Sequence, residues 1–545
     1  MVIKTLTNKL TNSHPSSSIN SAALIIAAAG VLSRVLGLIR DRILASQFGA
    51  GDTLDVYYAA FRVPDLIYNL LILGALSAAF IPVFTSLIAR DEEKEAWNLA
   101  NNLLSVALLV LLAISAIFAI FTPQLTRLIT PGFSGEKMTQ VIHLTRIMFL
   151  SPIFLGVSGI FGGILNSFKR FLVYSLAPIM YNLGIIIGVL FFVKPFGIAG
   201  LAWGVVLGAF LHMFLQYPAV KTTGFSFTPL FHFKNHHLRK VLKLMIPRTM
   251  GLAVTQINLL IITIIASTLA AGSLAVFNFA NNLQSFPLGV FAIPFALAVF
   301  PVLSHHAAKD EREVFVRNFS QTFRQILYFV IPTSVLLIIL RAQTVRVILG
   351  SGKFDWEDTI LTFQSLGIFA VSLFAQSSLP LLARSFYALH NTRIPFLTGL
   401  VSEAINLGLA IFLSMKFGVL GLIWAFSAAS ITNMLLLFFI LRRKLGDLDD
   451  KKIVSSVAKF AIAALSAGLT AQLVKYLIGP YTNLDTFVGV FTQLLTSGGA
   501  GILVYLLFSQ FLRLEEFESV KRLLTGKIFR FRQTLPEDPT EASGI

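Results

Sequence analysis

The sequence predicts an all-α polytopic membrane protein of about fourteen transmembrane helices, arranged as two tandem six-helix lobes plus two C-terminal helices. Three observations lead to this fold class: the share of hydrophobic residues, the number of long apolar runs, and an internal repeat. Of the 545 residues, 56% are hydrophobic and 13% are charged. A soluble protein of this size could not bury so much apolar surface, so we expect a membrane protein.

Apolar runs of about 20 residues, the length that spans a bilayer, occur along the whole chain. They lie at 21–46, 55–88, 97–121, 140–166, 172–193, 198–218, 240–269, 274–305, 317–340, 358–389, 395–415, 419–441, 454–478 and 486–511. The runs at 55–88, 274–305 and 358–389 exceed one span, so we expect tilted or kinked helices there.

Basic residues are concentrated in alternate loops. The richer loops contain Arg90 and Lys94, Lys169 and Arg170, Lys221 to Lys243, Lys309 to Arg317, and Arg442 to Lys452. The positive-inside rule places these loops, and both termini, on the cytoplasmic side of the membrane. The net charge of +17 has the same explanation, so nucleic acid is not an expected partner. The polar start of the chain does not resemble a cleaved signal peptide.

An internal repeat divides the chain. AFIPVFTSLIARDE at 79–92 resembles AVFPVLSHHAAKDE at 298–311, and GIAGLAWG at 197–204 resembles GVLGLIWA at 418–425, both about 220 residues apart. Six spans per repeat give the two lobes the same orientation, and repeat transporters bind substrate between their repeats. The predicted parts are a cytoplasmic segment 1–20, an N-lobe 21–218, a linker loop 219–239, a C-lobe 240–441, two extra helices 442–511 and a cytoplasmic amphipathic tail 512–545.

Charged residues interrupt the first two predicted spans. One charge at membrane depth costs at least ~3 kcal/mol on insertion scales, so several of mixed sign indicate a wet cavity. Arginine grips phosphate or carboxylate through paired donors, which favours an anionic substrate. The predicted substrate-binding residues of this hairpin are Arg34, Arg40, Asp41, Asp55 and Arg62. We expect Arg42 to lie at the membrane interface instead.

The matching hairpin of the second repeat carries amides. Asn281 and Asn282 can hydrogen-bond a phosphate or a sugar, and we include them in the predicted site. Hydrogen bonding between helices explains them equally well.

A carboxylate within an apolar run of the second repeat suggests ion coupling. The candidate Na⁺ or H⁺ site comprises Glu403, Asn406, Gln256 and Asn258. An ion pair of Glu403 with Arg384 or Arg393 is the alternative. The chain has no cysteine and no phosphate-binding G-x-x-x-x-G-K-[ST] loop, so we expect neither a thiolate metal site nor ATP hydrolysis, and no enzyme.

Several motifs in order along the chain resemble the MurJ (MviN) family of lipid II flippases, in the multidrug/oligosaccharidyl-lipid/polysaccharide exporter superfamily. They are SRVLGLIRD at 33–41, FGAG at 48–51, FRVPD at 61–65, GALSAAFIPVF at 74–84, TPGF at 130–133, GILNSFKRF at 163–171, APIMYN at 177–182 and FPLGVFAIPFALAVFPVLS at 286–304. Arg34, Arg40, Asp41, Asp55 and Arg62 match family positions. The family's typical Arg-Arg pair and acidic residue are replaced by Tyr68, Asn69 and Leu73, and its Asp-Arg pair by Asn281 and Asn282.

The resemblance implies a V-shaped, fourteen-helix, multi-pass flippase of the bacterial cytoplasmic (inner) membrane. Its central cavity would be cationic, though less so here than in the family's pattern. Its activity would move undecaprenyl-pyrophosphate-linked peptidoglycan precursor from the inner to the outer leaflet by alternating access, for cell-wall biogenesis. No cofactor is implied, and Na⁺, H⁺ or the membrane potential are candidate energy sources. The expected partners are lipid II, the membrane and cell-wall synthesis proteins. Two alternatives stay open: an exporter of another lipid-linked oligosaccharide, and a membrane scaffold for wall synthesis that transports nothing.

Overall fold

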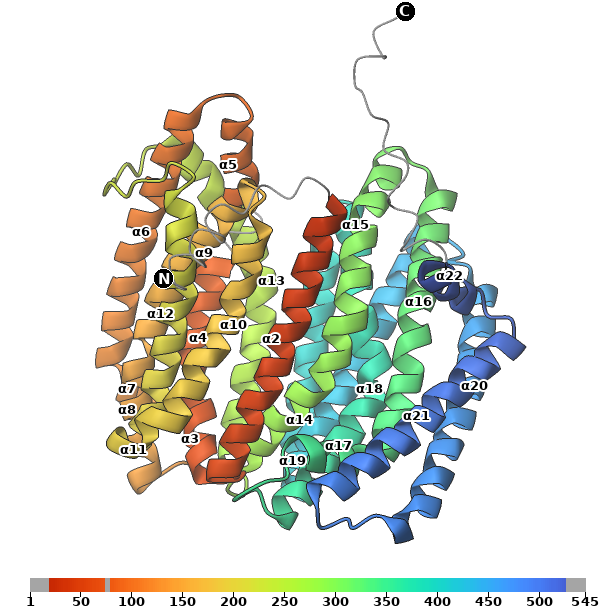
Figure 1. Ribbon diagram of the computed structural model, residues 1–545. Helices are drawn as coiled ribbons and strands as arrows, with labels where there is room; N and C mark the ends of the chain where they lie inside the picture. The colour runs from red at the N-terminus through yellow and green to blue at the C-terminus, as the bar shows by residue number, and fades with distance from the viewer. Residues whose placement is uncertain (1–18, 74–78, 526–545) are drawn as a thin grey trace, which may run out of the picture.

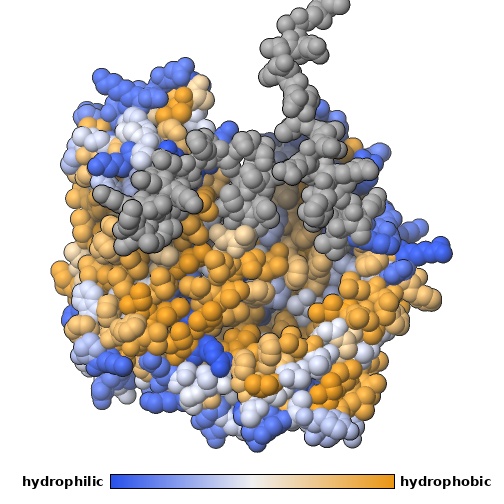
Figure 2. All heavy atoms as spheres, viewed as in Figure 1, coloured by the Kyte–Doolittle hydropathy of each residue, from blue (hydrophilic) through white to orange (hydrophobic). Residues whose placement is uncertain are grey.

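The computed structural model describes residues 19–73 and 79–525, and this part of the chain is helical without strands. The predicted N-terminal segment up to residue 18, five residues of the second predicted span and the last part of the predicted tail lie outside it. The helices run side by side between two ends of the molecule (Figure 1). Hydrophobic residues form a belt between polar upper and lower ends (Figure 2), as expected of a protein that crosses a bilayer.

The first part of the chain forms a bundle around its own core. Its helices are α2 (Ile19–Phe48), α3 (Asp52–Ala60), α4 (Arg62–Tyr68), α5 (Ile81–Ile88), α6 (Glu93–Ile120), α7 (Thr122–Ile129), α8 (Gly135–Met148), α9 (Leu150–Ser167), α10 (Phe171–Ile187), α11 (Val193–Phe196) and α12 (Ala199–Lys221). Phe80, Phe84, Phe161 and Ile164 lie in its buried core. This bundle is called the N-lobe below.

The second bundle repeats the pattern and carries the extra helices. Its helices are α13 (His236–Ser267), α14 (Ser273–Pro287), α15 (Ile293–Ala308), α16 (Arg312–Ile339), α17 (Arg341–Ile348), α18 (Trp356–Ala388), α19 (Arg393–Leu445), α20 (Asp450–Ile478), α21 (Phe487–Phe511) and α22 (Glu515–Thr525). Helices α13 to α19 are called the C-lobe. α20 and α21 pack on each other, and both contact α16. The contact of α21 with α16 includes a hydrogen bond from the Tyr505 hydroxyl to the Tyr328 carbonyl at 2.7 Å.

Ten helical segments in the described part of the chain are long and apolar enough to cross a membrane. One of them, α19, contains two predicted spans, 395–415 and 419–441. They are two helices separated by the non-helical Gly418 (φ 57°, ψ −136°), and they fold back on each other, since Ser402 Oγ donates to Ala429 O at 2.8 Å. The described residues of the predicted spans 21–46, 55–88 and 240–269 are also largely helical, but they fall outside these ten segments. The all-α polytopic fold is therefore as predicted.

Backbone features recur at the spacing of the internal repeat. Asp91 and Asp310, with φ of 59° and 54°, end the first hairpin of each lobe. Each of these hairpins also contains a π-helix, η1 (Asn69–Leu73) and η4 (Leu288–Ala292). Because a π-helix is rare and adds one residue to a turn, its occurrence at equivalent places indicates a shared local geometry in the two lobes.

The two lobes interlock at the lower end in Figure 1, opposite the basic loops that follow α5 and α15. Lys353 N donates to Ser46 O, and Ala50 N donates to Asp358 Oδ2, each at 2.8 Å. Gly272 has φ 84°, and a Cβ built there would lie 1.8 Å from Ala50 O. Only glycine permits so close an approach of the two loops.

Candidate functional site

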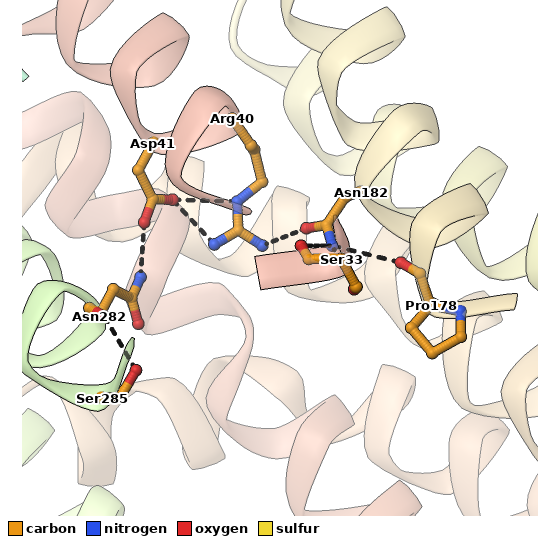
Figure 3. Close-up of polar contacts among 7 residues, drawn as sticks. All are labelled: Ser33, Arg40, Asp41, Pro178, Asn182, Asn282 and Ser285. Carbon is orange, nitrogen blue, oxygen red and sulfur yellow. Dashed lines mark hydrogen bonds and ion pairs between the residues drawn. The ribbon is translucent and has the colours of Figure 1, made fainter. Parts of the chain in front are cut away.

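A cluster of charged and polar side chains connects helices α2, α10 and α14 (Figure 3). It starts on α2, where the Arg40 guanidinium donates to Asp41 Oδ1 through Nε at 3.0 Å and through Nη2 at 2.8 Å. The Asp41 side chain is 2% exposed, whereas that of Arg40 is 21% exposed. The carboxylate is thus held within the protein, and the guanidinium keeps one edge toward open space.

Asparagines from two other helices complete this cluster. Arg40 Nη1 donates to Asn182 Oδ1 of α10 at 3.1 Å, and Asn182 Nδ2 reaches Ser33 O and Pro178 O. On the other side, Asn282 Nδ2 of α14 donates to Asp41 Oδ2 at 2.8 Å. Asp41 therefore accepts from both lobes, because α2 and α14 belong to different repeats.

Arg34 lies one and a half turns from Arg40 on α2 and contacts the C-lobe directly. Its Nη1 donates to the Ser285 carbonyl at 3.3 Å. A Cβ built at Gly289, in the π-helix η4, would lie 1.8 Å from Arg34 Cζ. The Arg34 guanidinium therefore packs directly on the backbone of Gly289, and a side chain at that position would displace it.

These residues line a cavity of about 220 Å³, whose lining includes Ser33, Arg34, Arg40, Asp41, Asn182 and Asn282. Two guanidinium groups and one carboxylate leave an excess of positive charge. A second cavity of about 450 Å³ lies in the N-lobe and shares Ser33 and Arg34 with the first. The pair of cavities offers an anion site with an adjoining neutral pocket.

Asp55 was predicted in the same site, but the structure places it at the junction of the lobes. The side chain is buried, and it accepts from Gly272 N at 2.8 Å and Ala275 N at 3.0 Å. Lys137 Nζ lies 3.2 Å away as an ion partner. Asp55 thus caps the N-terminus of α14 from the opposite lobe, where a carboxylate also interacts favourably with the helix dipole.

Arg62 and Asn281 likewise lie outside the cavity lining. Arg62 is buried, and its Nε donates to Thr263 Oγ1 at 2.7 Å while Nη2 donates to Asn278 Oδ1 at 3.3 Å. Asn281 Oδ1 accepts from Gln284 Nε2 at 3.1 Å. Arg62 thus connects α4 to α13 and α14, whereas Asn281 hydrogen-bonds within α14.

Arg42, which was expected at the interface, binds the end of a helix instead. Its Nη1 donates to Val347 O at 2.5 Å and to Ile348 O at 3.3 Å, at the C-terminus of α17. Its guanidinium also lies 5.3 Å from the ring centroid of Phe487. Arg42 therefore joins the lobes at the same lower end as Asp55.

The predicted ion-coupling residues form a separate cluster between α13 and α19. Asn258 Nδ2 donates to Glu403 Oε1 at 2.9 Å, and Asn406 Nδ2 donates to Asn258 Oδ1 at 3.1 Å. Asn406 Oδ1 is buried without a hydrogen-bond partner in the described part of the chain. Gln256 is buried on α13 but makes no hydrogen bond within this set.

The sequence analysis missed Asn182 as a site residue, although it noted the surrounding APIMYN motif. A mid-helix amide in an apolar run was the available signal, but that signal does not identify Arg40 as its partner. Ser33, which accepts from Asn182, was missed for the same reason.

Comparisons with known proteins agree with this geometry. A family model described as "Lipid II flippase MurJ" matches residues 44–492. A probable lipid II flippase MurJ of Bdellovibrio bacteriovorus is 30% identical over 463 residues, covering 84% of this chain and 88% of that protein. Its counterpart in Buchnera aphidicola subsp. Acyrthosiphon pisum is 29% identical over 474 residues, covering 85% and 91%.

Solved structures show the same architecture. A lipid II flippase MurJ in an inward closed conformation matches with a TM-score of 0.74 and 26% identity, covering 90% of this chain and 99% of that one. An inward-facing MATE family multidrug transporter of the MOP superfamily matches with a TM-score of 0.65 and 15% identity, covering 78% and 99%. The second likeness concerns the fold alone.

Proposed function

Because the chain belongs to the MurJ family of lipid II flippases, we propose that it moves lipid II from the inner to the outer leaflet of the bacterial inner membrane. The observation that carries this proposal is the cavity of Arg34 and Arg40 between the lobes. The cargo has a diphosphate, which cannot cross hydrocarbon unaided because burying unpaired charge is prohibitive. Guanidinium groups in a polar cavity replace the hydration of that group.

Moving lipid II across the membrane requires the protein to change between two conformations and involves no covalent chemistry. With the basic loops in the cytoplasm, the junction formed by Asp55, Arg42 and Asp358 lies at the periplasmic end. The cargo would then enter from the cytoplasmic leaflet and leave when this junction separates. The long prenyl tail stays in lipid during the movement, and exposed apolar residues on α20 and α21, such as Leu469 and Leu503, offer it a surface.

Cation coupling is a second part of the proposal. Glu403, Asn258 and the unpartnered Asn406 Oδ1 gather oxygen atoms, the ligands that hard cations prefer. We expect Glu403→Gln to remove any dependence of flipping on Na⁺ or pH. The same dependence in the variant and the parent protein would exclude this cluster as the coupling site.

The decisive experiment combines rescue of a flippase-depleted strain with a measurement of lipid II exposed on the outer leaflet. The parent chain should restore both growth and exposure, and Arg40→Ala should restore neither at normal protein level. Arg127→Ala is the matched control, because this arginine of α7 is exposed at the lower end, away from the cavity. Normal lipid II exposure with Arg40→Ala would refute the assigned role of the cavity.

Deleting residues 513–545 tests whether cell-wall synthesis proteins bind the tail. Loss of growth without loss of lipid II exposure would support such partners. Loss of function on this deletion, with dispensable cavity arginines, would favour the scaffold alternative.

A further inference from the structure

The N-lobe cavity of about 450 Å³ has the size of a small-molecule site, for which about 300–1,000 Å³ is usual. Helices α2, α4, α5, α9, α10 and α12 all contribute to its lining. It adjoins the arginine cavity through Ser33 and Arg34, which line both. A ligand with an anionic group beside Arg34 would therefore extend its next chemical group into this pocket.

The pocket wall is mostly apolar but contains a few polar side chains, and Arg34 at its shared edge is the one charged residue among the lining residues. Ser158 Oγ lies 2.6 Å from His212 Nδ1 and accepts from Gln216 Nε2 at 2.7 Å. Ser158 and Gln216 are 0% and 1% exposed. The three side chains fix one another, so their remaining polar atoms have defined positions.

One polar atom of this network is unsatisfied. Gln216 Oε1 is buried without a hydrogen-bond partner among the described residues. Leaving a buried acceptor without a donor is costly, and ligands often supply the missing partner. The wall also contains the hydroxyls of Tyr68, Tyr174 and Ser175. Donors and acceptors without net charge suit hydroxyl and acetamido groups rather than carboxylates.

Glycines open one side of the pocket. Gly159, Gly162 and Gly163 of α9 lie in its lining. A Cβ at Gly162 would come within 3.0 Å of the Tyr174 ring and 3.3 Å of Gln216 Oε1. The missing side chain thus lets an aromatic ring and an amide acceptor lie together, which suits a sugar ring with an apolar C–H face and polar hydroxyl groups at its edge.

We propose that this pocket binds the neutral sugar attached to the diphosphate of the transported lipid. The inference rests on the proposed function and goes beyond it, because it assigns recognition of the sugar to the N-lobe. Arg34 and Arg40 hold the diphosphate. The network of Ser158, His212 and Gln216 hydrogen-bonds the adjoining sugar ring. A lipid diphosphate without sugar would leave Gln216 Oε1 unsatisfied and bind less tightly.

The test uses the full chain in lipid nanodiscs and two probes, lipid II and undecaprenyl diphosphate without sugar. The parent protein should bind lipid II about tenfold more tightly than the bare diphosphate. Gly30→Leu fills the pocket, since Gly30 lines it and a Cβ there meets nothing within 4 Å. This variant should lose most of the tenfold preference and keep its affinity for the bare diphosphate within about twofold.

Gly408→Leu is the matched control, because Gly408 of α19 is also helical and open around its Cβ but lies outside the pocket. A second variant, Gln216→Met, keeps the side-chain length and removes the amide. It too should lower the preference for lipid II while sparing the bare diphosphate.

Equal affinity of the parent protein for both probes would overturn the sugar site. So would an equal loss of affinity for lipid II and for the bare diphosphate in Gly30→Leu and Gln216→Met. If the parent protein moves lipid II across the membrane in either of these cases, the flippase function stands and the sugar site fails alone. If the parent protein moves no lipid II, both proposals fail.

Discussion

Replacing Asp55 by alanine should separate the two lobes at their junction. The change leaves the buried N–H groups of Gly272 and Ala275 without an acceptor and Lys137 without its buried ion partner. Loss of a helix cap alone costs about 1–2 kcal/mol. Stranded buried donors raise the total to about 2–4 kcal/mol, which shifts the equilibrium between joined and separated lobes about 30- to 1,000-fold.

The chain lacks cysteine, so spin labels can be placed without removing native thiols. Gln124→Cys in α7 and Glu357→Cys in α18 are exposed positions on different lobes at the lower end. Pulsed electron paramagnetic resonance should give a short distance for the parent pair and an added longer distance with Asp55→Ala. Asp55→Asn keeps one acceptor oxygen and should be intermediate. An unchanged distance distribution with Asp55→Ala would refute the reasoning.

Other contacts give further expectations. Arg40→Lys keeps the charge but loses the paired donors, so lipid II exposure on the outer leaflet should fall at least about tenfold, and full exposure would contradict the bidentate role. Glu516→Gln breaks a buried ion pair with Arg324 and should lower the unfolding free energy by about 3–5 kcal/mol, seen as a lower melting temperature; an unchanged temperature would contradict it. The Lys452 hydrogen bond lowers the pKa of Glu515 below its ordinary 4.5, so this contact of α22 stabilises the fold above pH 4.5. The contact is lost as the pH falls through the lower folded value, and hydrogen exchange on α22 should then rise; exchange that does not change with pH would argue against the contact.

The fold could be predicted from the sequence because its two signals are strong and independent. Apolar runs give the helices, and the repeat of Pro82 at Pro301 and of Trp203 at Trp424 gives the two lobes. The division of α19 into two helices was also predicted, and the non-helical Gly418 separates them. The π-helices η1 and η4 were not predicted, because an extra residue in a turn leaves no trace in apolar periodicity.

The site was predictable only in part. A charge in an apolar run must have a partner, so Arg34, Arg40 and Asp41 were found without coordinates. The same rule cannot say whether that partner is a substrate, a side chain or a backbone group. The partners of Asp55 are backbone N–H groups of a helix 217 residues away, which every residue but proline carries. Sequence alone therefore could not distinguish this junction residue from a cavity residue.

The position of Asp41 connects cargo binding to the contact between the lobes. One carboxylate oxygen holds Arg40 of the N-lobe, and the other accepts from Asn282 of the C-lobe. A diphosphate that takes Arg40 competes with Asp41 for the same donors, because a guanidinium presents a fixed number of them. Freed from Arg40, the carboxylate retains only a neutral amide, so the network that joins α2 to α14 lacks its ion pair while the cargo is bound. A ligand shifts an equilibrium only by its unequal affinity for the two states. Competition for the Arg40 donors would make the affinity for the diphosphate differ between the two states. It requires only the contacts that α2 and α14 already make.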